Sequence, residues 1–489
     1  MKNRSWCLFA MAVLTACSHK QPGLDTIEQA AQALGGKARI LGFQTLTIEG
    51  AGTDANLGQN VTPEGELPVW KVTSYREVVS PGTAQMGVEQ VREAQFLFAG
   101  ATVQKAFQGL DGEVGYNIAE NGTISRLTET ATRDRRLDLI HHPVTAVRAA
   151  FDPKARVGEL RRLGNQDRVE ITTRRGDVIT LVLDRLTHLP AAVISRRYNE
   201  NLGDVIVETV FSGYEDVNGL KLPSRLTTHI DKYPGFDLHV TRNAVDADPP
   251  PVTPPAAKAT AAPPPPIKVT AQPVAKGIWW LAGSGNHHSI LFEFDDHLTI
   301  FEVPLNEARS YAVIDKARSL VPNKPVTQAI VSHHHFDHSG GLRVAVAEGL
   351  TIITYRGNVE FFKYLVDRKF TVLGDELGQH NRPMHIIPVD DEMTLKDKSM
   401  EVRLYHLLDN PREGTNLFAY VPRDKILVQA DLYDSSWNQY PWADNVLRNI
   451  ALRGLQVEKD VPVHGQIEPW PQVVQTMRQR GAGGAAGGK

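Results

Sequence analysis

The feature that most restricts the fold of this 489-residue chain is a proline-rich stretch in its middle. From Pro249 to Pro266 the sequence reads PPPVTPPAAKATAAPPPP. Proline fixes φ and removes an amide donor, so this stretch cannot join a sheet, and alanine adds little bulk to a core. The chain is too long for one ordinary core. Two domains are therefore expected, at residues 17–247 and 269–478, joined by a semi-rigid linker at 248–268.

The N-terminus has the features of a targeting segment. Lys2 and Arg4 precede an apolar run, Trp6–Ala16, that is too short to span a bilayer. The run ends in LTAC, which resembles a bacterial lipobox with Cys17 as the acylated residue. The expected product is a lipoprotein with a signal peptide at 1–16, anchored in the cell envelope and facing the periplasm. Ser18 in place of aspartate favours the outer membrane; an ordinary signal peptide or a buried first helix is the alternative.

Composition excludes several other classes of protein. The net charge is -3 and no block rich in lysine or arginine occurs, so a nucleic-acid partner is not expected. Cys7 and Cys17 are the only cysteines, which leaves no intrachain disulfide and no thiolate ligand in the mature protein. Residues 479–489 are mostly glycine and alanine and are expected to be disordered.

The segment before the linker is predicted to be rich in antiparallel strands. Strand-like runs are found at 70–79, 95–103, 169–173, 178–183 and 205–211. Asn121-Gly122 and Asn218-Gly219 predict tight hairpins, because both residues of such a turn take positive φ. One helix comes first, with Asp25 and Glu28 as a capping box. Long strands beside one helix predict a curved, half-barrel-like sheet.

Residues 211–243, FSGYEDVNGLKLPSRLTTHIDKYPGFDLHVTRN, resemble paired strands in the lipoprotein-carrier-like half-barrels of Gram-negative envelopes. The resemblance covers only part of this domain and contains no catalytic motif. It implies a concave apolar surface for a lipid or a partner. A plain structural domain is the alternative.

Beyond the linker, strand-like and helical stretches alternate. Strands are expected at 277–281, 289–294, 297–301 and 326–331, and helices at 308–320 and 342–348. Such alternation predicts an α/β domain in which helices cover sheets.

A dense group of metal-ligating residue types follows the strand at 326–331. The letters SHHHFDHSGG place His333, His335, Asp337 and His338 in the pattern H-x-H-x-D-H. Imidazoles two residues apart can converge on one ion, and the Asp-His pair can turn toward a second. Zn²⁺ binds imidazole nitrogen and carboxylate oxygen at about 2.0–2.2 Å. The pattern predicts a metal site, with a histidine-rich surface tract as the alternative.

Two later strand ends add residues of the same kind. A strand at 425–429 leads to Asp431, and a strand at 461–463 leads to His464. Taken singly, such an aspartate often caps a turn and such a histidine is often a loop residue. Three elements in this order, each at a strand end, favour one shared site.

These motifs together resemble the metallo-β-lactamase fold superfamily over residues 269–477. The matching stretches are LFEFDDHLTIFEVPLN, KPVTQAIVSHHHFDHSGGLRVAVAEGLTIIT, ILVQADLY and VPVHGQ. The resemblance implies an αββα sandwich with a metal site at one sheet edge. It implies a hydrolase whose metal-activated hydroxide attacks an ester, thioester, lactone, amide or phosphoester. One or two Zn²⁺ ions are expected, and iron or manganese also suits this ligand set.

The resemblance also assigns roles to residues. The first metal would be held by His333 and His335. The second would be held by Asp337, His338 and His464, and Asp431 would bridge the two metals. Asp337 would also be catalytic, orienting the nucleophile or carrying a proton to the leaving group.

One ligand of the superfamily pattern is missing. A third histidine normally serves the first metal, and aligning NPREGTNLFAYVP places Arg412 there. Arginine stays protonated and offers no lone pair to a metal. His406 is a candidate replacement, although its position in EVRLYHLL is equally that of a core histidine. Otherwise the first site is weakened, and Arg412 is available to bind an anionic group of the substrate.

Three functions remain open on this basis. The ligand set favours a metal-dependent hydrolase of a small-molecule substrate, with His287 and His288 as further substrate contacts or plain loop residues. Arg412 favours a non-catalytic binding or carrier lipoprotein with a degenerate metal site. An iron-dependent oxidoreductase is the third alternative.

Overall fold

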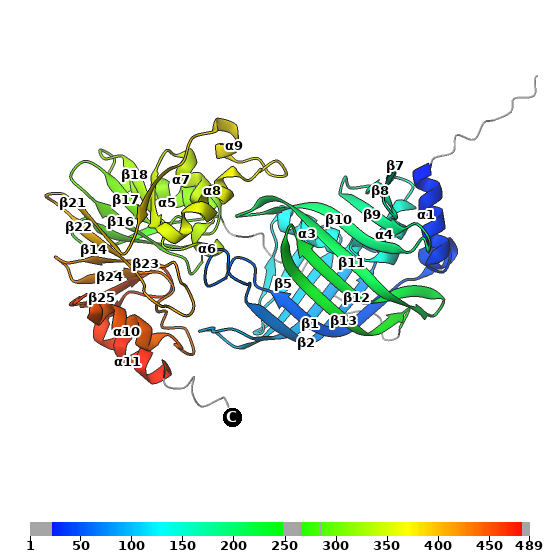
Figure 1. Ribbon diagram of the computed structural model, residues 1–489, viewed down its shortest axis with the longest axis horizontal. Helices are drawn as coiled ribbons and strands as arrows, with labels where there is room; N and C mark the ends of the chain where they lie inside the picture. Colours follow the sequence, from blue (N-terminus) through cyan, green and yellow to red (C-terminus); the bar gives the residue numbers. More distant parts are fainter. Residues whose placement is uncertain (1–21, 248–263, 265, 284, 482–489) are drawn as a thin grey trace, which may run out of the picture.

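The structure is a computed structural model that describes residues 22–247, 264, 266–283 and 285–481 (Figure 1). The predicted signal peptide, Cys17 and most of the linker lie outside these residues. Among the described helices, none combines the length and the apolar character needed to cross a membrane.

The N-terminal region is a large antiparallel sheet that curves around helices (Figure 1). The chain runs outward from β1 to β6, crosses through helices to the opposite edge, and returns from β7 to β13, which pairs with β1. The strands are β1 (Leu46–Ala55), β2 (Val69–Ser80), β3 (Gln85–Ala94), β4 (Val103–Asp111), β5 (Val114–Ile118), β6 (Ile124–Arg126), β7 (Arg156–Leu163), β8 (Gln166–Thr172), β9 (Val178–Asp184), β10 (Pro190–Asn199), β11 (Gly203–Val217), β12 (Leu220–Ile230) and β13 (Tyr233–Val245). The helices are α1 (Pro22–Ala33), α2 (Lys37–Gly42), α3 (Glu129–Ile140) and α4 (Pro143–Ala150).

The core of this region lies between the helices and the concave face of the sheet. On strand β9 Val182 is buried on one face, and Ile179, Leu181 and Leu183, every second residue, are buried on the other. The latter three side chains belong to one apolar cluster with Ile27 of α1 and Val144 of α4. The predicted half-barrel-like β-rich domain is confirmed.

The C-terminal region consists of two sheets packed face to face with helices outside. The first sheet holds β14 (Thr270–Ala275), β15 (Ile278–Ala282), β16 (Ser289–Glu293), β17 (Leu298–Phe301), β18 (Val326–Ile330), β19 (Thr351–Tyr355) and β20 (His385–Val389). The second holds β21 (Glu392–Lys396), β22 (Glu401–His406), β23 (Leu417–Val421), β24 (Ile426–Gln429), β25 (Lys459–Pro462) and β26 (Glu468–Pro469). The helices are α5 (Glu307–Leu320), α6 (Phe336–Ser339), α7 (Leu342–Ala347), η2 (Arg356–Asn358), α8 (Val359–Asp367), α9 (Glu376–His380), α10 (Ala443–Leu452) and α11 (Trp470–Gly481).

Apolar side chains from both sheets fill the space between them. Phe292 and Ile330 of the first sheet are fully buried in one cluster with Val402, Val428 and Val461 of the second. Helices α5 and α7 cover the outer face of the first sheet, and α10 and α11 that of the second. This is the αββα sandwich that the sequence predicts. Helix α11 extends into the first residues of the expected disordered tail.

Several local predictions need correction. Residues 95–102 form a loop rather than a strand, because Phe96 and Phe98 pack edge-on against Trp70 instead of alternating across a sheet. The first helix begins at Pro22, so Asp25 lies within it and is not its cap. The sequence prediction also missed α3 and α4. The Asn218-Gly219 hairpin is confirmed, with φ of 52° and 76° at its two residues.

The two regions share apolar cores. Leu202 of the β10–β11 loop and Val205 and Val207 of β11 belong to the cluster that contains the buried side chains of α5 and α7. Ala99 belongs to the cluster beneath α10 and α11. At the same boundary the Arg368 guanidinium donates to the carbonyl of Leu202 at 2.6 Å. These contacts fix the orientation of the two domains.

A half-buried acid in the N-terminal sheet makes stability depend on pH. Glu77 lies on β2 and accepts a hydrogen bond of 3.0 Å from the Tyr75 hydroxyl. Burial raises the pKa of Glu77 to about 7; the Tyr75 hydrogen bond opposes this shift and Asp138 adds to it. The folded state therefore holds a proton that the unfolded chain releases, and stability falls as pH rises from 4.5 to about 7.

We predict that Glu77→Gln removes this loss of stability. Urea denaturation at pH 4.5 and pH 8 gives the unfolding free energy of both proteins. Between these two pH values, the difference in unfolding free energy, variant minus wild type, should rise by about 2 kcal/mol. Glu89→Gln, on the exposed side of β3, is the matched control and should leave the pH dependence unchanged. Equal pH dependence in wild type and Glu77→Gln would contradict the assignment.

Candidate metal centre

Ligand atoms from separate strand ends meet at one edge of the sandwich. The strand β18 leads to His333 and His335, and α6 follows with Asp337 and His338. The structure forms two groups in which the ligand atoms lie within 4.8 Å of one another. The first is His333, His335, Glu413 and Asp431; the second is His287, Asp337, His338 and His464. All six predicted ligands are thus brought together, and two further residues join them.

The first group presents lone pairs without partners. His333 Nε2 and His335 Nδ1 are buried and have no hydrogen-bond partner in the described part of the chain. They lie 3.8 Å and 4.0 Å from the two carboxylate oxygens of Glu413. Burial, reinforced by the nearby Arg412 charge, lowers the pKa of His335 to about 4, so this imidazole is neutral. Buried polar atoms without partners are rare, and a divalent cation fits this donor set.

The second group has its nitrogens converging on one point. His338 Nε2 and His464 Nε2 are 3.2 Å apart. Two nitrogens bound at the usual distance to one tetrahedral zinc ion lie about 3.4 Å apart. Asp431 Oδ1 is 3.0 Å from each of these nitrogens, and Asp337 Oδ2 is 3.4 Å from His338 Nε2. Asp431 therefore belongs to the first group and faces the second, which is the place of a bridging ligand.

Two ligand-positioning residues have unusual backbone conformations. Asp431, just after β24, has φ of 61°, and Glu302, just after β17, has φ of 74°. Left-handed conformations are uncommon for residues other than glycine and cluster at functional sites. They end both strands abruptly and turn the two carboxylates toward the histidines.

In His464 and in the candidate ligand histidines of the H-x-H-x-D-H motif, the ring nitrogen that faces away from the ligand group contacts a polar atom of the protein. Such contacts fix the tautomer and the orientation of a metal-binding imidazole. The pairs are His333 Nδ1 with Ser332 Oγ at 2.8 Å, His335 Nε2 with the Asn60 carbonyl at 2.9 Å, His338 Nδ1 with Glu302 Oε2 at 3.1 Å, and His464 Nδ1 with the Asn286 carbonyl at 2.6 Å. The buried Glu302 makes a carboxylate–histidine pair of the kind that supports metal ligands.

Asp337 is held on both carboxylate oxygens. Gln59 Nε2 donates to Oδ1 at 2.9 Å, and His287 Nε2 lies 3.0 Å from Oδ2. Burial alone would raise the pKa of Asp337, but the charge of His338 and the hydrogen bond from His287 hold it well below its usual range. Asp337 is therefore ionised, as a ligand or proton acceptor must be.

Glu413 is the residue that the sequence prediction missed. Aligning NPREGTNLFAYVP one residue later puts this carboxylate in the place of the third histidine. Glutamate binds divalent cations and arginine does not, which was the available signal. Arg412 instead pairs with Glu413 and Asp431 at 2.6 Å and 2.7 Å. These two pairs use Nε and one terminal nitrogen of the guanidinium, and the binding of a substrate anion by Arg412 stays a prediction.

For His406 and His288 the structure favours the structural alternatives over a metal or substrate role. His406 Nε2 contacts the Gly414 carbonyl at 3.0 Å and its ring stacks on Tyr355, so it is not in either ligand group. His288 is 5% exposed and packs against Trp280 with ring centroids 4.2 Å apart. It does not overhang the site. His287, in contrast, belongs to the second ligand group, where it contacts Asp337.

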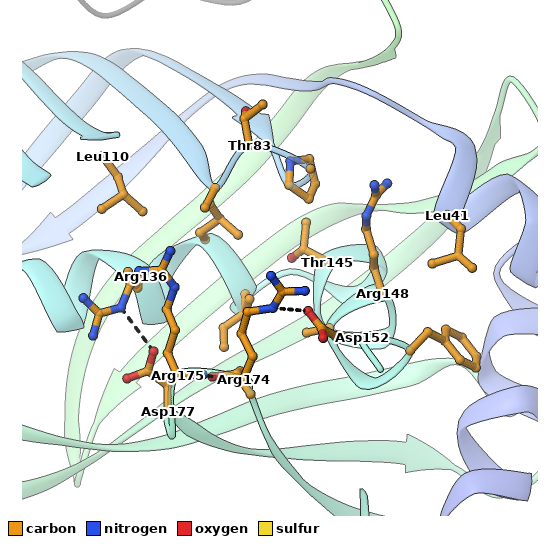
Figure 2. A pocket seen from close by; sticks show the side chains of 18 of the residues that line it. Leu41, Thr83, Leu110, Arg136, Thr145, Arg148, Asp152, Arg174, Arg175 and Asp177 are labelled. Atoms are coloured by element: carbon orange, nitrogen blue, oxygen red, sulfur yellow. Dashed lines mark hydrogen bonds and ion pairs between the residues drawn. The ribbon is translucent and has the colours of Figure 1, made fainter. Parts of the chain in front are cut away.

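A separate cavity of about 450 Å³ lies in the N-terminal domain (Figure 2). Its lining combines apolar residues of α3 and α4 with arginines. Arg136 pairs with Asp177 and Arg174 with Asp152, as Figure 2 shows. The lining holds four arginines and two aspartates, so it keeps an excess of positive charge, and it is remote in sequence from every residue of the two ligand groups.

Residues 283–402 match the family model of the metallo-beta-lactamase superfamily. This match identifies a metallo-β-lactamase superfamily domain at residues 283–402, within the two-sheet sandwich. The match includes the H-x-H-x-D-H motif and ends before Glu413, Asp431 and His464.

Solved structures give similar matches. A metallo-beta-lactamase from Pontibacter korlensis is 13% identical with a TM-score of 0.34, over 43% of this chain and 96% of that one. The FIM-1 enzyme from Pseudomonas aeruginosa, in its mono-zinc form, is 14% identical with a TM-score of 0.34, over 45% and 97%. A search of curated proteins gives no match.

We predict that the two ligand groups hold separate metal ions. Wild type dialysed against Zn²⁺ should retain two equivalents by elemental analysis, and Glu413→Ala and His464→Ala should each retain one, because each removes a ligand from a different group. His380→Ala, an exposed histidine of the same domain, should keep both. Two equivalents in Glu413→Ala would show that Glu413 is not a ligand.

Proposed function

We propose that the C-terminal domain is a dinuclear metal-dependent hydrolase, with zinc as the favoured metal, acting on an ester, thioester, lactone, amide or phosphoester. The observation that carries this proposal is the position of Asp431 between two four-residue ligand groups. A shared carboxylate is the arrangement that holds two divalent cations close together. Membership of the superfamily supports hydrolysis as the reaction class, although a fold alone does not define a substrate.

The protein side chains position the reaction and move its protons. Cations bound in the two groups supply Lewis acidity toward a carbonyl or phosphoryl oxygen and toward water. Asp337, ionised and held by Gln59 and His287, orients the attacking water and accepts its proton at Oδ2. His287 donates to the same carboxylate through the 3.0 Å contact and orients it, and protonated Asp337 then returns the proton to the leaving group. Neither serine nor cysteine is needed as a nucleophile.

The binding or carrier alternative rests on a specific observation about Arg412. Its guanidinium already neutralises part of the charge on Glu413 and Asp431. If it replaces a cation there, only the second group binds metal, and the domain is a binding module with one structural ion. Metal stoichiometry and turnover together distinguish the two functions.

The location of the protein is part of the same proposal. The LTAC sequence supports acylation at Cys17 and a lipid anchor on the periplasmic face of the envelope, with the outer membrane favoured. The substrate would then be a small molecule of that compartment. Acylation is tested by mass spectrometry of the mature N-terminus.

We predict that hydrolysis depends on the metal ligands. Mature protein loaded with Zn²⁺ should turn over a member of a panel of chromogenic esters, phosphodiesters and cephalosporins. Chelation or His338→Ala should lower kcat/KM by about a thousandfold or more, because the Lewis acid and the second ligand group are lost. His380→Ala should keep wild-type kinetics. Full turnover in His338→Ala would refute the mechanism, and one equivalent of metal without turnover would favour the carrier function.

A further inference from the structure

Three loops of the N-terminal domain dock around the edge that carries the metal centre. They are residues 56–68 between β1 and β2, 95–102 between β3 and β4, and 200–202 between β10 and β11. In the third loop, Asn201 Nδ2 donates to the Phe336 carbonyl and to Ser339 Oγ, both at 3.0 Å, and so holds the two ends of α6. In the second, the Ala99 carbonyl accepts from the Asn438 amide at 2.9 Å.

The loop at 56–68 contacts the segments that carry the candidate ligands directly (Figure 1). The Phe336 amide donates to the Gly58 carbonyl at 3.2 Å, and the Gly414 amide donates to the Val61 carbonyl at 2.7 Å. Gly58 has φ of 76°, and a Cβ at this position would lie 2.2 Å from the Phe336 ring. Only glycine allows this approach. The two anchors lie next to ligands of both metal groups.

Between the anchors, Gln59 and Asn60 touch the ligands themselves. The Asn60 carbonyl is 2.9 Å from His335 Nε2, and Gln59 Nε2 donates to Asp337 Oδ1 at 2.9 Å. A carbonyl oxygen can only accept, so the proton of neutral His335 lies on Nε2. The lone pair of this imidazole is then on Nδ1, which faces Glu413. The matching partners of His333, His338 and His464 all belong to the C-terminal domain.

We propose that the N-terminal domain completes the metal centre, with Gln59 and Asn60 as positioning residues for Asp337 and His335. This inference rests on the proposed metal-binding function. One of the five histidines in the two ligand groups, His335, has its tautomer fixed from the N-terminal domain. The proposed proton acceptor, Asp337, is oriented from the same domain. The shared apolar cores and the half-buried Arg368 contacts keep the two domains, and so the loop, in place. The site is therefore built by both domains, and the N-terminal domain is not a passive spacer.

The experiment uses the full mature chain with Zn²⁺ and Co²⁺ as probes. Gln59→Leu removes the amide donor at nearly constant size, and Gly58→Ala forces the loop away from Phe336. Glu64→Ala, at an exposed position of the same loop, is the matched control. Loss of a hydrogen bond that supports a ligand typically weakens metal binding about tenfold to a hundredfold. We expect that loss in Zn²⁺ affinity for the first two variants, by chelator competition, and wild-type affinity for the third.

Two further readouts separate positioning from folding. The visible spectrum of the Co²⁺ protein reports ligand geometry and should change in Gln59→Leu and Gly58→Ala. Nitrogen NMR of labelled histidine in the metal-free protein should show His335 protonated on Nε2 in wild type and a tautomer mixture in Gly58→Ala. Should Gly58→Ala unfold, Gln59→Leu decides, since Gln59 is only half-buried and its replacement does not force the backbone of the loop to move.

Unchanged affinity and an unchanged Co²⁺ spectrum in folded Gln59→Leu and Gly58→Ala would overturn this inference and leave the hydrolase proposal intact. A wild-type protein that binds neither Zn²⁺ nor Co²⁺ would overturn both. Equal losses in Glu64→Ala would assign the effect to the loop in general and would also overturn the specific roles of Gln59 and Asn60.

Discussion

The arrangement of this site depends on the carboxylate of Asp431, which is buried between two sets of imidazoles. One oxygen faces His338 and His464 at 3.0 Å, and the other accepts from Arg412 at 2.7 Å. A carboxylate without partners would not be buried at such cost. Although burial opposes ionisation, the charges of His338, His464 and Arg412 hold the pKa of Asp431 well below its usual range. The segments that carry His338, His464 and Arg412 each bring a nitrogen atom to this one side chain.

Much of the site follows from short-range sequence patterns. His333, His335, Asp337 and His338 come from one turn, so their spacing alone places them together. Asp431 and His464 were predictable because each follows a buried strand, and such strands end at a common edge of the sandwich. The two-sheet fold was predictable for the same reason: alternation and apolar periodicity are local properties of the chain.

Other parts were beyond local patterns. Gln59 and Asn60 lie 278 and 275 residues before their partners, and a glutamine or a backbone carbonyl has no recognisable signature in a sequence. Helix α3 was missed because its letters, ETATRDRRLDLI, look like a solvated stretch. Its Leu137 and Ile140 are nevertheless buried, because the curved sheet surrounds the helix. Tertiary packing overrode local propensity in that case.

The positive charge of Arg412 compensates the negative charge that Glu413 brings to the first ligand group. A first site with three histidines and one aspartate would carry one net positive charge when it holds a divalent cation. Exchanging one histidine for Glu413 removes one charge, and the adjacent guanidinium of Arg412 restores it. Burial and the neighbouring Asp431 raise the pKa of Glu413 in the metal-free protein, so an incoming cation competes with a proton there. Because the carboxylate is a harder ligand than imidazole, this exchange shifts the first site toward metals that prefer oxygen. Arg412 and Glu413 would therefore act as one unit: the carboxylate would supply the ligand, and the arginine would keep its charge compatible with a buried site.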